Sequence, residues 1–313
     1  MLSYFLRRLL MAIPVLLVVA LSVFLLLRLS PGDPATIIAG DMANPEQVAN
    51  IRHALGLDQP IHSQFLIWMG NLLQGDFGTS LISQTPVSSM ITQRLEPTIS
   101  LAVAAILITV LVAVPLGVVA AWRQGSWIDN AVMSTSVIGF SVPVFVIGYL
   151  LIQVFAIELR WLPVQGFRSM DQGMAEYLRR LVLPALTLSS VYIALIARMT
   201  RASMLEVLQE DYIRTARAKG LSQRVVLFRH ALRNAGVPIL TVIGAGFTLM
   251  VSGVVVTESV FNIPGLGRLI VDAVLARDYP VIQALILLTA GLYVVINLLI
   301  DLSYAITDPR IRY

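Results

Sequence analysis

The chain has 313 residues, of which 57% are hydrophobic and 13% are charged, and its mean hydropathy is +0.82. Because about a quarter of an average soluble domain is charged, this composition indicates a membrane protein and excludes an ordinary soluble enzyme. The lack of cysteine excludes disulfide bonds, thiolate metal ligands and a cysteine nucleophile, and we attribute the formal net charge of +4 to membrane topology and not to nucleic-acid binding.

Six uncharged apolar stretches approach or exceed the ~20 helical residues that cross a hydrocarbon core of about 30 Å. They cover residues 9–27, 97–121, 131–157, 181–197, 236–257 and 279–300. The sequence therefore predicts an all-α integral membrane fold with six transmembrane helices. Prolines inside the stretches are expected to kink or end them, since proline removes a backbone donor; they are Pro115, Pro143, Pro184 and Pro238.

The first stretch is predicted to be a retained helix. Arg7 and Arg8 precede it as in a signal peptide, but it is longer than a usual signal core and residues 30–34 offer no small-x-small cleavage site. Basic residues are more numerous on the side that holds both termini and residues 198–234. The positive-inside rule then places the termini and this segment in the cytoplasm.

Short amphipathic helices are predicted in the outer connections. Asn44-Pro45-Glu46 is typical of a helix start and Gly56 of its end, and a second helix is expected over about 60–75. These helices either pack on the bundle as a lid, which we favour, or contact an external partner. Another short helix is predicted after Pro264-Gly265, carrying an exposed Arg268–Asp272 pair.

One polar segment, residues 210–238, interrupts the apolar pattern. Helix-favouring residues cover 200–217, and a second helix is predicted over 222–234. Ala216 and Gly220 have a small-xxx-small spacing that leaves a shallow surface for another protein to approach. The physical pattern alone favours a solvated loop, and docking of a partner is the alternative.

Charge on this segment has its own pattern. Glu210 and Arg214 are expected to pair at i, i+4, and Arg217 and Lys219 surround the shallow surface. Lys219 is the only lysine in the chain. A Walker A loop needs a lysine before serine or threonine, whereas Lys219 precedes a glycine, so the chain has no such ATP site of its own.

The segment resembles the cytoplasmic EAA loop of permease subunits from ATP-binding-cassette importers, in the version of the dipeptide and oligopeptide branch. The resemblance rests on Asp211-Tyr212-Ile213-Arg214-Thr215-Ala216-Arg217-Ala218-Lys219-Gly220-Leu221 followed by His230-Ala231-Leu232-Arg233-Asn234-Ala235. It covers nearly the whole chain through further motifs in order: Arg7-Arg8-Leu9, Pro31-Gly32-Asp33-Pro34, Leu55-Gly56-Leu57-Asp58-Gln59-Pro60, Gly75-Asp76-Phe77-Gly78, Pro264-Gly265-Leu266-Gly267, Arg277-Asp278-Tyr279-Pro280-Val281 and Asp308-Pro309-Arg310-Ile311-Arg312.

The resemblance implies the type I importer permease fold, with a coupling helix seated in a groove of an ATPase. The last five spans would form the core, and the first would pack on them or on a sister permease. The residues expected at the ATPase are Glu210, Asp211, Tyr212, Arg214, Thr215, Ala216, Arg217, Lys219 and Gly220. Arg214-Thr215-Ala216 stands where the general motif has EAA, so Asp211 or Glu210 would supply the missing acidic charge.

The resemblance also implies a complex in the bacterial inner membrane. The expected partners are a second homologous permease, two ATPases, an external solute-binding protein and the lipid bilayer, without nucleic acid. The chain would be a transport subunit and not an enzyme, and would bind no cofactor, because ATP and magnesium belong to the ATPases. Dipeptides, oligopeptides or glutathione are the expected substrates, and nickel chelates or another small solute are the alternative.

The expected parts are a first helix at 1–30, an external loop at 31–96, a five-helix core at 97–306 that contains the coupling loop 199–235, and a tail at 307–313. Polar residues that either line a pathway or bond between packed helices are Ser134, Ser136, Ser141, Gln153 and Asn297. Glu258 and Asp301 are expected near span ends, as interface or pathway residues.

Other classes of function find less support in the sequence. An ATP-independent channel or secondary carrier would be favoured by internal repeats or buried charges, and a membrane-bound hydrolase by a nucleophile elbow; neither pattern is found. His53, His62 and His230 lack metal-ligand spacing, so no metal site is expected.

Overall fold

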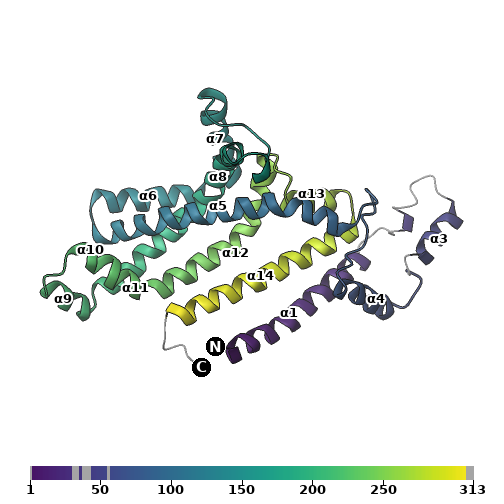
Figure 1. Ribbon diagram of the computed structural model, residues 1–313, viewed down its shortest axis with the longest axis horizontal. Helices are drawn as coiled ribbons and strands as arrows, with labels where there is room; N and C mark the ends of the chain where they lie inside the picture. Colours follow the sequence, from purple (N-terminus) through teal and green to yellow (C-terminus); the bar gives the residue numbers. More distant parts are fainter. Residues whose placement is uncertain (1, 30–34, 37–43, 55–56, 308–313) are drawn as a thin grey trace. The chain divides into compact units, whose positions relative to one another are not determined.

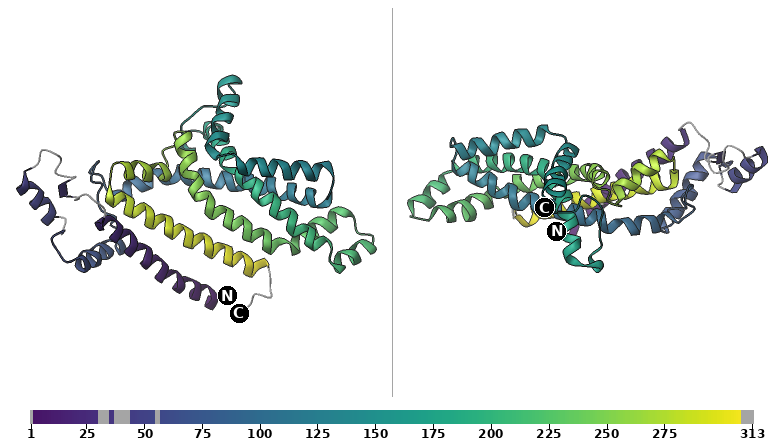
Figure 2. Two further views of the ribbon diagram at one scale, coloured as in Figure 1. Left: turned by 180° about the vertical axis from the view of Figure 1, so that it is seen from behind. Right: turned by 90° about the horizontal axis from the view of Figure 1, so that it is seen from above.

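The computed structural model describes residues 2–29, 35–36, 44–54 and 57–307. Within these ranges the regular structure is helical, apart from an isolated bridge between Thr79 and Pro86. The residues form two compact units: the larger contains Glu96–Gly267, and the smaller combines the described residues of Leu6–Leu95 with Arg268–Val294. Figure 1 labels the helices, and Figure 2 shows them from two further sides.

Among the residues that the structure describes, five helices are long and apolar enough to cross a membrane. They are α1 (Leu2–Leu29), α5 (Val87–Trp122), α8 (Met174–Leu208), α12 (Gly236–Val260) and α14 (Tyr279–Thr307). Each contains one of the predicted spans. Pro115 and Pro184 lie inside α5 and α8 without ending them. Both helices are longer than predicted because they continue beyond the apolar stretches into flanking polar residues.

The predicted span over 131–157 is bent and not continuous. α6 (Trp127–Ser141) is followed, at an angle of 103°, by α7 (Val144–Leu151) and a π-helical turn, η1 (Ile152–Glu158). Val142 and Pro143 between them are extended, with ψ of 126° and 139°. Proline disfavours the α conformation in the residue before it and has no N–H to donate, so the expected break at Pro143 is confirmed and the continuous span was wrong.

Shorter helices connect the long ones. They are α3 (Pro45–Ala54), α4 (Ile61–Leu73), the 3₁₀ turn η2 (Met170–Gln172), α9 (Asp211–Ala218), α10 (Gln223–Val225), the π-helical η3 (Val226–Ala231), α11 (Leu232–Asn234) and α13 (Leu266–Leu275). The predicted helices near 44 and 60 and after Pro264-Gly265 are thus confirmed, and Arg268 and Asp272 pair at 3.9 Å. The predicted stop at Gly56, the motif at 31–34 and the tail at 308–313 lie outside the described residues.

In the smaller unit, α4 packs on α1 through aromatic rings. The ring centroid of Phe24 on α1 lies 5.3 Å from that of Phe65 and 5.6 Å from that of Trp68, both on α4. Elsewhere in this unit, Asp278 accepts hydrogen bonds from the Ser80 hydroxyl at 2.5 Å and the Leu81 N–H at 3.1 Å. The long connection therefore packs on its own chain, and its contact with an external partner stays a prediction.

The larger unit contains two main apolar clusters. One joins α5, α7, η1, α8 and α12 around Leu101, Leu183 and Met250. The other, which we call the α9 core, joins the ends of α5, α8 and α12 to α9 and η3, and consists of Val118, Ala121, Met204, Ile213, Ala216, Val226, Leu227, Ala231, Ala235 and Ile239. Burying one aliphatic side chain contributes roughly 1.5–3 kcal/mol, so this cluster positions the polar segment.

Candidate functional site

The polar segment starts at a break between two helices. α8 ends at Leu208. The Gln209 N–H donates to the Glu206 carbonyl and the Glu210 N–H to the Val207 carbonyl, both at 3.2 Å, and Glu210 is extended with ψ of 147°. α9 begins at the next residue. The single helix predicted over 200–217 was therefore wrong, because the chain leaves the helical conformation at Glu210.

One face of α9 is buried and the other is exposed. Ile213 is 0% and Ala216 6% exposed, and both belong to the α9 core. Since an isolated helix of eight residues is unstable in water, this buried face must stabilise α9. The shallow surface predicted around Ala216 is corrected accordingly, because the Ala216 side chain contacts its own chain. The other residues predicted to contact the ATPase are all exposed: Glu210, Asp211, Tyr212, Arg214, Thr215, Arg217, Lys219 and Gly220.

Gly220 ends the segment in a left-handed conformation, with φ of 75°. Its N–H donates to the Arg217 carbonyl at 2.9 Å, which closes the last turn as glycine commonly does after a helix. An added Cβ would have no atom within 4 Å. The surface around Gly220 is therefore open, and glycine is favoured there by the backbone and not by packing.

One ion pair on α9 differs from the predicted pair. Arg214 pairs with Asp211 at 3.2 Å and not with Glu210. The two side chains are 74% and 94% exposed, so the pair contributes only a few tenths of a kcal/mol. Asp211 also lies in the first turn of α9, where a carboxylate interacts favourably with the helix dipole. An acidic group is thus presented at the surface one turn before Arg214.

The second predicted helix, 222–234, is confirmed as a run of α10, η3 and α11. Val226, Leu227 and Ala231 of η3 are buried in the α9 core, whereas Phe228 is 52% exposed. The exposed basic residues of the polar segment are Arg214, Arg217, Lys219, Arg224, Arg229 and Arg233. The segment thus offers a mainly positive surface with exposed aromatic side chains.

Tyr212 lies where α9 meets α11. Burial raises the pKa of its hydroxyl, the charge of Glu210 raises this pKa further, and a hydrogen bond with the Asn234 side chain lowers it. The net direction is upward, so the hydroxyl stays neutral near physiological pH. Tyr212 can therefore contact a partner as an uncharged hydrogen-bonding group.

Among the described hydrogen bonds, none joins one of the five candidate pathway residues to another. Ser136 and Ser141 donate to the carbonyls of Val132 and Val137 in their own helix, at 2.7 and 2.8 Å, and Gln153 donates to Glu158 at 3.1 Å. Ser136 is buried, and the others, including Ser134 and Asn297, are exposed. Bonding within the helix is a third possibility beside the pathway and interhelical roles, and the pathway role stays a prediction.

Glu258 lies two residues before the end of α12, so its predicted position near a span end is confirmed. It is 0% exposed and accepts a hydrogen bond from the Thr98 hydroxyl at 2.6 Å. Thr98 in turn accepts one from the Leu266 N–H at 2.8 Å, and a Cβ at Gly265 would overlap the Glu258 carboxylate. Glu258 is thus a buried residue that joins α5, α12 and the following turn and is not an exposed interface residue, while a pathway role stays a prediction.

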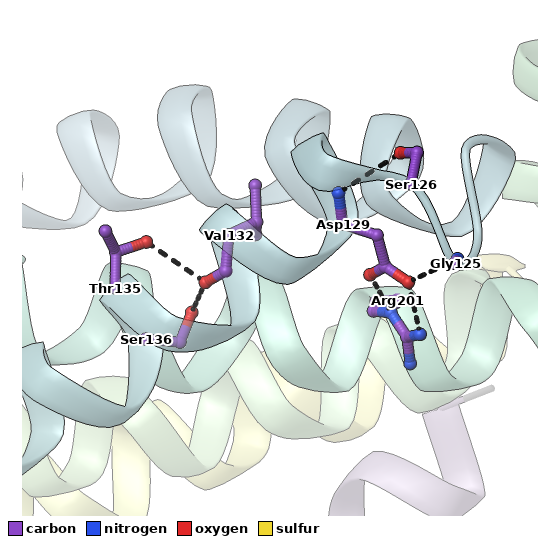
Figure 3. A network of polar contacts seen from close by, with 7 residues as sticks. All are labelled: Gly125, Ser126, Asp129, Val132, Thr135, Ser136 and Arg201. Atoms are coloured by element: carbon purple, nitrogen blue, oxygen red, sulfur yellow. Dashed lines mark hydrogen bonds and ion pairs between the residues drawn. The ribbon is translucent and has the colours of Figure 1, made fainter.

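A buried ion pair near the polar segment was not predicted from the sequence. Figure 3 shows Asp129 of α6 against Arg201 of α8, with two hydrogen bonds of 2.5 and 2.7 Å. The two residues are 72 positions apart, so no local pattern could join them. A local signal existed nonetheless: Ser126 and Asp129 have the spacing of a helix start, and Asp129 is a lone acid beside an apolar stretch.

Known sequences match the chain over its length, and a known structure matches most of it. The family described as "Binding-protein-dependent transport system inner membrane component" matches residues 113–313, and the family of the corresponding N-terminal part matches residues 1–102. The chain belongs to this family. It is accordingly an integral membrane permease of the ATP-binding-cassette importer type, as the sequence predicted.

In the residues that the structure describes, no group of three His, Asp or Glu side chains could hold a metal ion.

Individual relatives support the same family. The permease is 58% identical over 310 residues, 99% of both chains, to the "Probable peptide ABC transporter permease protein y4tP" of Sinorhizobium fredii. It is 47% identical over 313 residues, the full length of both chains, to the "Glutathione transport system permease protein GsiC" of Salmonella choleraesuis. The permease fold is similar to that in an inward-facing structure of the MetNI methionine ABC transporter, with TM-score 0.58 and 17% identity, over 70% of this chain and 96% of the other.

Proposed function

We propose that this permease imports small peptides, including glutathione-like ones, as one of two homologous membrane subunits that enclose a common pathway. The names of the full-length relatives, peptide permease at 58% identity and glutathione permease at 47%, support this substrate class. An external binding protein delivers the peptide, and two ATPases on the opposite side bind ATP and magnesium.

The observation that carries the proposal is the geometry of α9. This short helix is fixed through Ile213 and Ala216 to the same apolar cluster as the ends of α5, α8 and α12, and its other face presents Asp211, Arg214 and Arg217 to solvent. A rigidly seated helix with an exposed charged face is suited to follow a partner protein. We assign it as the coupling helix that contacts an ATPase.

The cycle follows from this assignment. Closure of the ATPases on ATP displaces α9, and the α9 core transmits the displacement to α5, α8 and α12, which opens the pathway outward; hydrolysis reverses the change. The excess of basic residues on the α9 side supports a cytoplasmic position for α9 and for both termini in a bacterial inner membrane.

Crosslinking tests the coupling role. The chain has no cysteine, so Thr215→Cys introduces a single thiol on the exposed face of α9. Gln172→Cys is the matched control, because Gln172 is also exposed but precedes the other end of α8, whose 35 residues span about 52 Å. We expect thiol crosslinking in the assembled complex to capture an ATPase from T215C and not from Q172C. Equal capture from both, or capture from neither, would contradict the assignment.

Transport measurements test the substrate class. Proteoliposomes that contain both permeases and both ATPases, supplied with the binding protein, should import a labelled dipeptide, an oligopeptide or glutathione only with ATP. Import of a nickel chelate but of no peptide would show that the substrate class is wrong. Import by the permeases without any ATPase would instead support a channel or carrier.

A further inference from the structure

Both oxygens of the Asp129 carboxylate are bonded to neighbouring groups. Its two oxygens accept hydrogen bonds from Arg201 Nε at 2.5 Å and from the second guanidinium nitrogen at 2.7 Å, and the Gly125 N–H donates to one of them at 3.0 Å (Figure 3). The side chains of Asp129 and Arg201 are 3% and 23% exposed. A two-pronged contact of this kind fixes direction as well as distance, so it holds the start of α6 in one register against α8.

Arg201 lies close to the coupling helix on a continuous element. α8 runs without a break from Met174 to Leu208, and Gln209 and Glu210 are all that separate it from α9. Met204, one turn after Arg201, is 0% exposed and lies with Ile213 of α9 in the α9 core. A displacement of α9 therefore reaches the backbone of Arg201 through packed, helical structure.

α5 contacts α8 one turn before the ion pair. Gly117 of α5 approaches so closely that an added Cβ would lie 2.6 Å from the Ala197 carbonyl oxygen and 2.6 Å from the Thr200 Cβ. Small residues allow such close backbone contact between membrane helices. Close packing at Gly117 thus holds α5 against α8, and the ion pair between Asp129 and Arg201 holds α6 against the next turn of α8.

Three other polar side chains of α6 do not hold it against α8. Thr135, Ser136 and Ser141 all donate hydrogen bonds to carbonyls of α6 itself, and Gly139 meets Ala194 of α8 in an ordinary contact, 3.5 Å from an added Cβ. Apolar contacts allow two helices to slide more easily than a directional bond does. A buried ion pair is also weak evidence for stability, because an apolar pair often stabilises as well, so its best attested use is to fix register.

We propose that Asp129 and Arg201 are positioning residues that make α6 move with α8 and α9, and so couple ATP hydrolysis to peptide import. This inference rests on the proposed function. Neither residue contacts substrate or nucleotide in the proposal. Without the pair, α9 stays packed on the α9 core. α6 and the bend at Val142-Pro143 that follows it then no longer move together with α8.

The test compares import with hydrolysis in the fully assembled importer. D129N/R201Q removes both charges and leaves amides that can bond to one another, so no buried charge is left unpaired. We expect the double variant to assemble and to hydrolyse ATP, while peptide imported per ATP falls about tenfold, within the 5- to 150-fold typical of coupling between sites. R198Q is the matched control: it removes an exposed arginine of α8 and should leave the ratio unchanged.

R201K supplies a second, milder change, because lysine keeps the charge but lacks the planar fork of arginine. We expect it to lower the ratio less than the double variant. An unchanged ratio in D129N/R201Q, or in R201K if the double variant does not assemble, would overturn the proposal while wild-type import stays ATP-dependent. If wild-type complexes import no peptide with ATP, the proposed function itself is wrong.

Discussion

Replacing Ile213 by alanine should weaken the packing of α9 on the α9 core. Ile213 is 0% exposed and is packed among the residues of the α9 core. Truncation of a buried isoleucine to alanine costs about 2–5 kcal/mol, and α9, with eight residues, has too few internal hydrogen bonds to remain helical alone. At ~1.4 kcal/mol per factor of ten, even the lower figure raises the local opening equilibrium roughly 30-fold.

Limited trypsin digestion measures this opening, because α9 and its C-terminal turn carry Arg214, Arg217 and Lys219. We expect I213A to be cleaved after these residues at least about ten times faster than wild type, with the sites mapped by mass spectrometry. I138A is the control, since Ile138 on α6 undergoes the same truncation but is 62% exposed. If cleavage at α9 in I213A stays within about twofold of wild type, burial of Ile213 does not hold the helix.

Four further substitutions test packing, hydrogen bonding and backbone conformation through the midpoint of thermal unfolding. Gly117→Ala should destabilise by roughly 1–3 kcal/mol through overpacking, whereas Gly139→Ala, where the nearest atom would be 3.5 Å away, should be nearly neutral. Thr98→Val removes the hydroxyl bonded to buried Glu258 and should cost about 1–3 kcal/mol. Gly220→Ala should cost roughly 1 kcal/mol, because φ of 75° is unfavourable for residues with a Cβ. Neutral behaviour of G117A or T98V would contradict the corresponding contact, and neutral behaviour of G220A would contradict the left-handed conformation of Gly220.

Local sequence signals predicted most helices. Apolar runs identified the five long helices, and the start of α3 follows from Asn44, whose side chain accepts from the Gln47 N–H at 2.8 Å while Gln47 bonds back to the Asn44 N–H at 3.1 Å. Proline effects are also local, so a break at Pro143 could be expected. Its angle of 103° could not, because packing against α8 and α12 and not the dipeptide decides where α7 goes.

Contacts between residues far apart in the chain could not be predicted from the sequence. The spacing of Ala216 and Gly220 was correctly noticed, but whether Ala216 pointed outward depended on how α9 lies on α5 and η3. The burial of Glu258 was not expected, because its hydrogen bond to Thr98, 160 residues away, has no local signature. The same holds for Asp129 and Arg201, where only the lone acid at the helix start was visible.

The length of α8 on either side of Ala197 has a mechanical consequence. From the close contact with Gly117, 11 residues lead to Leu208 and 23 lead back to Met174, which at 1.5 Å per residue gives arms of about 16 and 35 Å. If α8 turns as a rod about this contact, a 1 Å shift beside the coupling helix becomes roughly 2 Å in the opposite direction at the far end. The Gly117 contact would then act as a fulcrum that both reverses and amplifies the motion of α9.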